Sequence, residues 1–411
     1  MKTIESTIPA PIHPAGILSD RNSIPLCRTA FFDIETTGLA AEASSIYLIG
    51  LLLYDASQGC YRLTQWFADN YHSEKLMLMQ FLHALADIDR LCHFNGKTFD
   101  IPYVLKKCKR HKIEVPAHCQ ELFEGVNGTE SLDLLQEIRA MKKLLGLTQC
   151  KQTAIEHWLG ISRESSISGK ELTLVYSEYM QKKLLNPPDS DKLLSVLLLH
   201  NHDDIAMLLE LCSILNYKEY LAGTEKNPLL TKENLAAMTI HYEETKQLLT
   251  LALPLPIPLP REIILTGQYA PATAQVDFHP SAPWQLTLTK ATAYYQIPVF
   301  TGSLKYFLPN YSEYYYLPEE DTAIHKSIAS FVDSSHRKKA TAATCFNRRE
   351  GRFLPLLYRR QSKKADSPVL PVFREEYKSF PAFCELPEDY QSNWTFWKEY
   401  LTAQMDGLTK L

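Results

Sequence analysis

Three short groups of polar residues in this chain have types and spacings that suit metal-dependent chemistry. In the first, two phenylalanines lead into Asp33-Ile34-Glu35, and Thr36-Thr37-Gly38 ends the apolar run. Because side chains alternate along a strand, Asp33 and Glu35 lie on one face. Two neighbouring carboxylates repel each other, and a hard divalent cation such as Mg²⁺ takes oxygen ligands. The pair indicates a metal site, and a solvated edge strand is the alternative.

The second group is Phe94-Asn95-Gly96-Lys97-Thr98-Phe99-Asp100-Ile101-Pro102. It follows a short apolar strand, and Pro102 suits the first turn of a helix. This places the Asp100 carboxylate at a strand-to-helix junction. The backbone N–H groups and Lys97 of such a junction suit a phosphate. The alternative is that Asp100 only caps the helix.

The third group lies in the apolar stretch Leu197–Leu209 and reads His200-Asn201-His202-Asp203-Asp204. On a helix, His200 and Asp204 are four residues apart and share a face, with Asn201 beside them and Asp203 pointing away. An Asp204 carboxylate on a helix that looks buried needs a partner, which a metal ion would supply. The alternative is a polar helix edge exposed to water.

The elements that must position these groups are strands and helices of an α/β domain. Strands are expected at about 29–35, 46–54 and 61–67, a helix after Ser73, and a short strand at 91–94. With 411 residues the chain is too long for one ordinary domain. The expected parts are a poorly ordered lead-in (1–28), an α/β domain (29–215), a helical connection with a proline-rich boundary (216–260), and a smaller α+β C-terminal domain (261–411).

The C-terminal part is rich in aromatic and basic residues. Between Ser334 and Lys364 there are ten Lys and Arg residues and one acid, Glu350, and six aromatic residues lie within 305–317. A helix is expected to start at Glu319 and to end near Lys339. Basic charge beside exposed aromatic rings is typical of single-stranded nucleic acid binding. A β-domain with a solvated basic rim is the alternative.

Composition sets the broad class. The net charge is −4, hydrophobic residues make up 45%, and nine cysteines are scattered without a C-x-x-C pair. That cysteine pattern favours a reducing compartment over a disulfide framework. No apolar run reaches the roughly 18 residues of a membrane span, and the N-terminus lacks the apolar core of a signal peptide. A soluble, cytoplasmic protein without membrane partners is expected.

The order of the three groups resembles the DEDD exonucleases of the RNase H-like (DnaQ-like) superfamily, and within it the YprB-like group. The resemblance covers about residues 29–215, where FDIETTGL, FNGKTFDIP and HNHDD resemble the three family motifs. It implies an RNase H-like mixed sheet flanked by helices. It also implies 3′-to-5′ exonuclease activity on DNA or RNA, expected at a single-stranded end, with two divalent cations, Mg²⁺ or Mn²⁺.

The resemblance also assigns residues to roles. It implies metal ligands at Asp33, Glu35, Asp100 and Asp204, and His200 joins them as a catalytic residue. The family divides by the residue before the last Asp: Tyr with three intervening residues, or His with four. Here His200 has three, so the residue belongs to one subtype and the spacing to the other. Substrate contacts are expected from the residues flanking the motifs: Thr36, Leu39, Asn95, Lys97, Phe99 and Asn201. A non-catalytic nucleic-acid-binding module and a scaffold for a protein partner are the alternatives.

Overall fold

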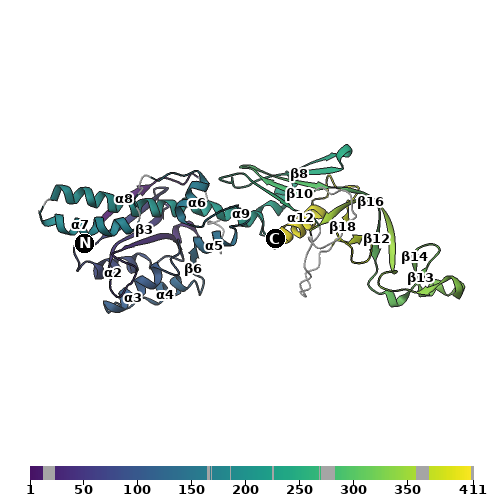
Figure 1. Ribbon diagram of the computed structural model, residues 1–411, viewed down its shortest axis with the longest axis horizontal. Helices are drawn as coiled ribbons and strands as arrows, with labels where there is room; N and C mark the ends of the chain where they lie inside the picture. Colours follow the sequence, from purple (N-terminus) through teal and green to yellow (C-terminus); the bar gives the residue numbers. More distant parts are fainter. Residues whose placement is uncertain are drawn as a thin grey trace. The chain divides into compact units, whose positions relative to one another are not determined.

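The computed structural model of the chain describes residues 1–12, 24–163, 167, 169–185, 187–224, 226–267, 269, 283–357 and 370–408. These residues form two compact units, 1–216 and 217–411. Figure 1 shows a sheet flanked by helices in the first unit and mostly strands in the second. No helix among the described residues is both long enough and apolar enough to span a membrane.

The first unit is built on one six-stranded sheet with the strand order β1-β4-β3-β2-β5-β6. Strands β1 to β4 pair antiparallel, whereas β2, β5 and β6 pair parallel. The strands are β1 (Lys2–Ile8), β2 (Thr29–Thr36), β3 (Ile46–Asp55), β4 (Cys60–Phe67), β5 (Arg90–His93) and β6 (Glu130–Asp133). The predicted α/β mixed sheet with flanking helices is therefore confirmed.

Helices cover both faces of this sheet (Figure 1). Figure 1 shows α7 and α8 along one face and α2, α3 and α4 along the other. The helices of this unit are α2 (Glu74–Ala84), α3 (Asp100–Arg110), α4 (Ala117–Glu124), α5 (Leu134–Ala140), α6 (Gln152–Leu159), α7 (Gly169–Leu185) and α8 (Pro187–Leu211).

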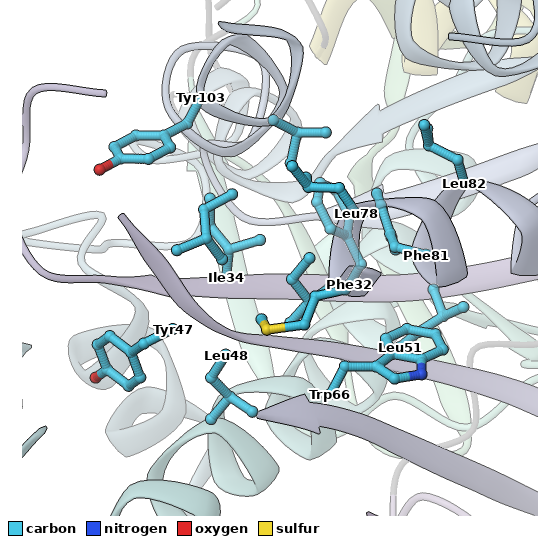
Figure 2. Close-up of a cluster of buried hydrophobic side chains, with 14 of the residues drawn as sticks. Phe32, Ile34, Tyr47, Leu48, Leu51, Trp66, Leu78, Phe81, Leu82 and Tyr103 are labelled. Atoms are coloured by element: carbon cyan, nitrogen blue, oxygen red, sulfur yellow. The ribbon is translucent and has the colours of Figure 1, made fainter. Parts of the chain in front are cut away.

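Strand β2 is central in the sheet, and its alternation sorts apolar from acidic side chains. Phe32 and Ile34 are buried on the face covered by α2 and α3, where the Phe32 ring stacks on Phe81 with centroids 5.4 Å apart. Figure 2 shows both residues in this core, beside Leu78 and Tyr103. Burying such side chains contributes roughly 1.5–3 kcal/mol each. The opposite face of β2 carries Asp33 and Glu35, which therefore point toward α8.

The second unit is β-rich. It holds a five-stranded sheet of order β7-β8-β11-β10-β9, a small closed barrel of β12-β16-β18-β17, and a three-stranded sheet of order β14-β13-β15. The strands of the five-stranded sheet are β7 (Thr239–Glu243), β8 (Leu248–Pro254), β9 (Ile263–Gly267), β10 (Trp284–Leu288) and β11 (Thr292–Pro298). The others are β12 (Phe300–Phe307), β13 (Tyr314–Leu317), β14 (Thr322–His325), β15 (Lys338–Lys339), β16 (Phe346–Leu356), β17 (Phe373–Arg374) and β18 (Ala382–Glu385). The helices are α9 (Leu215–Tyr220), α10 (Lys232–Ala236), α11 (Lys326–Ala329) and α12 (Trp394–Leu408).

Three expectations about the chain's organisation need correction. Residues 2–8 of the expected lead-in form β1, an edge strand that pairs antiparallel with β4. Every second side chain of β1 is partly buried there, so the segment is ordered as part of the sheet. The expected connection at 216–260 contributes β7 and β8 to the five-stranded sheet of the second unit. The expected helix from Glu319 is a β-hairpin instead. Asp321 adopts a positive φ at its turn and accepts a hydrogen bond from the Tyr316 hydroxyl at 2.6 Å.

Candidate active site

The carboxylates of Asp33 and Glu35 lie on the face of β2 that α8 covers. Asn201 Nδ2 of α8 donates a hydrogen bond to Asp33 Oδ2 at 3.1 Å. His200 Nε2 lies 3.7 Å from Glu35 Oε1. The pairing of β2 with β3 shifts register just after Glu35, which ends the regular ladder at this point. The two acids therefore stand near the C-terminal end of the central strand β2.

Asp100 reaches the same place from the start of α3. Strand β5 pairs with β2 only at Thr29, Ala30 and Phe31, so the backbone of β2 continues beyond its parallel neighbour. There Ile34 N–H donates to Asp100 Oδ1 at 3.3 Å. The Asp100 carboxylate thus takes the place of the missing strand partner and is buried between β2 and α3.

His200 and Asp204 lie one turn apart on α8, as the sequence spacing predicts. Their side chains meet: His200 Nε2 is 3.1 Å from Asp204 Oδ2. Single ligand atoms of Glu35, His200 and Asp204 lie within 4.8 Å of one another. Sequence motifs separated by up to 171 positions are brought together here, because α8 packs directly on β2 and β3.

Asn201, which the sequence placed among the substrate contacts, lies elsewhere. Its side chain is fully buried between α8 and the sheet. Besides donating to Asp33, it accepts a hydrogen bond from Gln65 Nε2 at 2.9 Å. Gly50, the β3 partner of Asp33, makes room for it, since a Cβ there would overlap the side chains of Asn201 and Ile205. Asn201 therefore orients a carboxylate rather than facing a substrate.

The acids of this site carry more negative charge than their surroundings compensate. Burial, reinforced by the charges of Asp204 and Asp100, raises the pKa of Asp33 well above its usual range. Burial and the Asp204 charge raise the pKa of Glu35 to about 8, and burial raises the pKa of Asp100 to about 7. Burial alone would lower the pKa of His200, but its hydrogen bond to Asp204 and the neighbouring carboxylate charges raise it. Clustered pKa shifts of this kind mark functional sites.

These residues fit a divalent cation. The donor set is carboxylate oxygens with one imidazole, which suits Mg²⁺ or Mn²⁺. The cluster of Glu35, His200 and Asp204 brings ligand atoms close enough to share one ion. Burial, with the charge of Asp204, raises the pKa of Glu35 and of Asp100, so the site disfavours its own ionised carboxylates. A bound cation would supply the compensating positive charge.

Sequence reasoning missed one charged partner in the site. Arg163 Nη1 forms an ion pair with Asp204 Oδ1, and its other nitrogens bind Glu156. No motif signals it, because Arg163 lies beyond the end of α6 and follows Gly160, which closes that helix in the left-handed region. The contact exists only because α6 packs against α8.

The other predicted site residues lie in the two turns that flank Glu35 and Asp100 in the sequence. Leu39 is 87% exposed, and Thr36 donates its hydroxyl to the Gly38 carbonyl oxygen at 3.0 Å. Asn95 adopts a positive φ in the turn before α3, and Lys97 is exposed beside it. The Phe99 ring packs against Tyr103, 5.5 Å between centroids.

Ser131, His93 and Asp133 have the composition of a hydrolytic triad but not its proton arrangement. Gly96 N–H donates to His93 Nδ1 at 3.1 Å, so Nδ1 is the acceptor. His93 Nε2 therefore carries the proton and donates to Ser131 Oγ at 3.0 Å. A nucleophilic serine needs the reverse tautomer. Asp133 instead caps α5 and accepts from Asn95 N–H at 3.0 Å, so this group supports the turn that leads to Asp100.

The basic segment of the second unit is neutralised in part by acids distant in sequence. Arg348 pairs with Asp321, and Arg349 pairs with Glu385 at 2.8 Å. The Arg337 guanidinium lies over the Tyr315 ring at 5.0 Å. Four of the ten basic residues, at positions 359, 360, 363 and 364, lie outside the described residues. The ten basic residues counted in the sequence therefore overstate the unpaired positive charge among the residues that the structure describes.

Residues 30–216 match a family model described as the RNase_H superfamily. This agrees with the fold described above, and the first unit is an RNase H-like domain. A DNA polymerase of Ostreid herpesvirus 1 (isolate France) is 39% identical over 51 residues, which are 12% of this chain and 3% of the polymerase.

Solved structures with similar chains include the family B DNA polymerase of the archaeon Pyrobaculum calidifontis. It is 14% identical with a TM-score of 0.36, over 74% of this chain and 40% of that chain. The zinc-bound form of E. coli exonuclease I with single-stranded DNA is 11% identical with a TM-score of 0.27, over 60% of this chain and 55% of that chain. This chain therefore spans less than two thirds of each of these proteins.

Proposed function

We propose that the RNase H-like domain is a metal-dependent nuclease that hydrolyses phosphodiester bonds, as a 3′-to-5′ exonuclease on DNA or RNA. One observation carries the proposal. Four carboxylates from three separate elements and one histidine converge at the end of the central strand β2. A converging set of buried acids is costly without a cation, because each charge disfavours the others.

Asp33, Glu35, Asp100 and Asp204 would hold two divalent ions. When bound, such ions polarise the phosphoryl oxygens and lower the pKa of a coordinated water. The chain itself supplies orientation. Asp33 is held by Asn201 and Asp100 by the backbone of β2, so both carboxylates are fixed before a ligand arrives.

His200 is the candidate for proton transfer. Its Nε2 lies 3.1 Å from Asp204 Oδ2 and 3.7 Å from Glu35 Oε1, so the ring stands beside two of the proposed metal ligands. Imidazole exchanges protons near neutral pH, with an ordinary pKa of about 6.5. Although burial opposes it, the hydrogen bond to Asp204 raises the pKa of His200 in the metal-free site, so cations that neutralise the neighbouring carboxylates would favour the neutral ring that accepts a proton. Its spacing from Asp204 is one helical turn, which brings the ring to the carboxylate directly. We assign His200 to water activation at this position.

Residues beside the acids would contact the nucleic acid. The exposed Leu39 lies at the turn that follows Glu35, where it could pack against a terminal base. Thr36, Asn95, Lys97 and Phe99 come from the same two turns. Lys97 would attract the phosphate backbone. A single-stranded end fits this proposal because the side chains of Glu35 and Asp204 are only 12% and 17% exposed, and a flexible end reaches such groups more readily than a duplex does.

Degradation of labelled oligonucleotides tests this function. Single- and double-stranded DNA and RNA with a 5′ label are incubated with Mg²⁺ or Mn²⁺, so that 3′-to-5′ digestion gives a descending ladder. The comparison is between the wild type, Asp33→Asn and Asp87→Asn, the last changing an exposed acid outside the site. We expect digestion by the wild type and Asp87→Asn only. Equal digestion by Asp33→Asn would show that a contaminating nuclease is responsible. Binding without digestion by the wild type would favour a non-catalytic binding module.

A further inference from the structure

We propose that Arg163, anchored by Glu156, is a positioning residue that presents Asp204 to the metal site through one carboxylate oxygen, Oδ2. The inference rests on the proposed function, since it concerns how that site holds its cation. It assigns a role to two residues outside the three sequence motifs.

Glu156 anchors the guanidinium in a fork-to-fork pair. Arg163 Nε lies 2.5 Å from Glu156 Oε2, and Arg163 Nη2 lies 2.5 Å from Glu156 Oε1. The Glu156 side chain is only 2% exposed. Bidentate pairs of this kind fix the plane of the guanidinium as well as its place. The direction of the remaining nitrogen, Nη1, is therefore set by α6.

That remaining nitrogen pairs with Asp204 Oδ1. A second contact from the same helix holds the backbone, because Gln152 Nε2 donates to the Asp204 carbonyl oxygen at 3.1 Å. Arg163 thus holds the side chain of Asp204, and Gln152 of α6 holds its main chain. The free rotation of the carboxylate about its χ2 bond is removed before any ligand binds.

The two carboxylate oxygens of Asp204 therefore have different partners. Oδ1 is taken by Arg163, whereas Oδ2 faces His200 at 3.1 Å. One carboxylate oxygen of Asp204 belongs to the cluster that includes Glu35 and His200. Asp204 can then bind a cation through Oδ2 without losing its arginine. A carboxylate whose orientation is fixed in advance binds a metal with less loss of entropy.

Charge alone does not explain the arrangement. Glu156 and Arg163 form a buried pair with opposite charges, so together they add little net charge near Asp204. If Arg163 only competed with the metal for Asp204, the bidentate pair with the Glu156 carboxylate would serve no purpose. What the pair contributes is direction, and a lysine cannot reproduce that fork.

Metal binding measured without catalysis tests this role. Mn²⁺ is titrated into the full-length wild type, Arg163→Lys, Arg163→Gln and Glu156→Gln, and unbound Mn²⁺ is followed by electron paramagnetic resonance. Circular dichroism reports whether each variant is folded. We expect Arg163→Lys to raise the Kd for Mn²⁺ about 10- to 100-fold although it keeps the positive charge. Glu156→Gln keeps one acceptor for the guanidinium, so it should raise the Kd for Mn²⁺ less than Arg163→Lys does. If Arg163→Lys does not fold, Glu156→Gln still tests whether the anchored guanidinium matters for Mn²⁺ binding.

Two results would overturn the inference. Tighter Mn²⁺ binding by Arg163→Gln with no change in Arg163→Lys would show that Arg163 acts as a competing charge. Unchanged Kd values in all three variants, with lower melting temperatures only, would leave Arg163 a purely structural residue. The proposed function fails in a different way, because the wild type would then bind no Mn²⁺ or Asp33→Asn would bind it equally well.

Discussion

The Asn201 side chain donates a hydrogen bond to Asp33 Oδ2 at 3.1 Å, across the interface between α8 and the sheet. It is held for this task by Gln65, whose amide donates both to Asn201 Oδ1 and to the Leu198 carbonyl oxygen at 2.9 Å. This relay links β4, α8 and β2 at the candidate site. It lowers the pKa of Asp33, against the larger upward effect of burial.

Removing the amide should therefore weaken the site. In Asn201→Ala the Asp33 carboxylate loses its donor, so its pKa rises further and it holds a cation less well at pH 7. We expect the Kd for Mn²⁺ to rise about tenfold and the unfolding free energy to fall by about 1–3 kcal/mol. Mn²⁺ titration at pH 7 and 9 checks the first effect, which should be smaller at pH 9. An equal loss at both pH values would contradict it.

The two acids Asp33 and Asp204 should differ in their effect on the metal-free protein. Both Asp33→Asn and Asp204→Asn should lower the rate of hydrolysis about 10²- to 10³-fold. Burial and the neighbouring carboxylate charges raise the pKa of Asp33, so Asp33→Asn should stabilise the metal-free fold at pH 8. Asp204 pairs with Arg163 and His200, so Asp204→Asn should destabilise it. Urea unfolding with a chelator present distinguishes the two, and equal shifts would argue against this charge distribution.

The stability of the metal-free protein should fall as the pH rises. The pKa of Glu35 is about 8 in the fold against an ordinary 4.5, and that of Asp100 is about 7 against 3.8. The folded state therefore binds more protons than the unfolded state, and stability drops with increasing pH between about 4 and 8. Thermal unfolding in EDTA at pH 5.5, 7 and 8.5 measures this.

The same acids provide a control for that slope. Glu35→Gln removes one of the raised pKa values, so its stability should depend less on pH than that of the wild type. Saturating Mg²⁺ should flatten the slope as well, since a cation favours the charged forms. A slope that neither change affects would assign the pH dependence to groups outside the site.

Gly50 sets how closely α8 approaches the sheet. A Cβ at Gly50 would overlap the side chains of Asn201 and Ile205, so Gly50→Ala should cost about 1–3 kcal/mol of unfolding free energy. It should also raise the Kd for Mn²⁺ by displacing Asn201. Gly169→Ala is the matched control, because a Cβ at this first position of α7 meets nothing within 4 Å. Equal stability of the two variants would show that α8 can shift without consequence.

Much of the candidate site could be predicted from the sequence. The alternation in β2 places Asp33 and Glu35 on one face, and the helical spacing places His200 and Asp204 together. Both depend on local geometry, which short patterns report directly. The order of the three motifs also led to the RNase H-like fold. Local patterns did not predict strands whose pairing partners are remote in the sequence. The alternating side chains of β1, for example, indicate a strand only once β4 is known to pair with it.

The tertiary structure alone decided which residues support the acids. Arg163 and Asp204 are 41 positions apart, and Gly50 meets Asn201 across 151 positions. Likewise, Arg348 and Arg349 read as free charges until the fold brings Asp321 and Glu385 to them. The sequence by itself determined which side chains have the donor chemistry that a cation site needs, because that is a property of residue type and local spacing. How those side chains are oriented and neutralised depends on contacts between distant elements, which only packing creates.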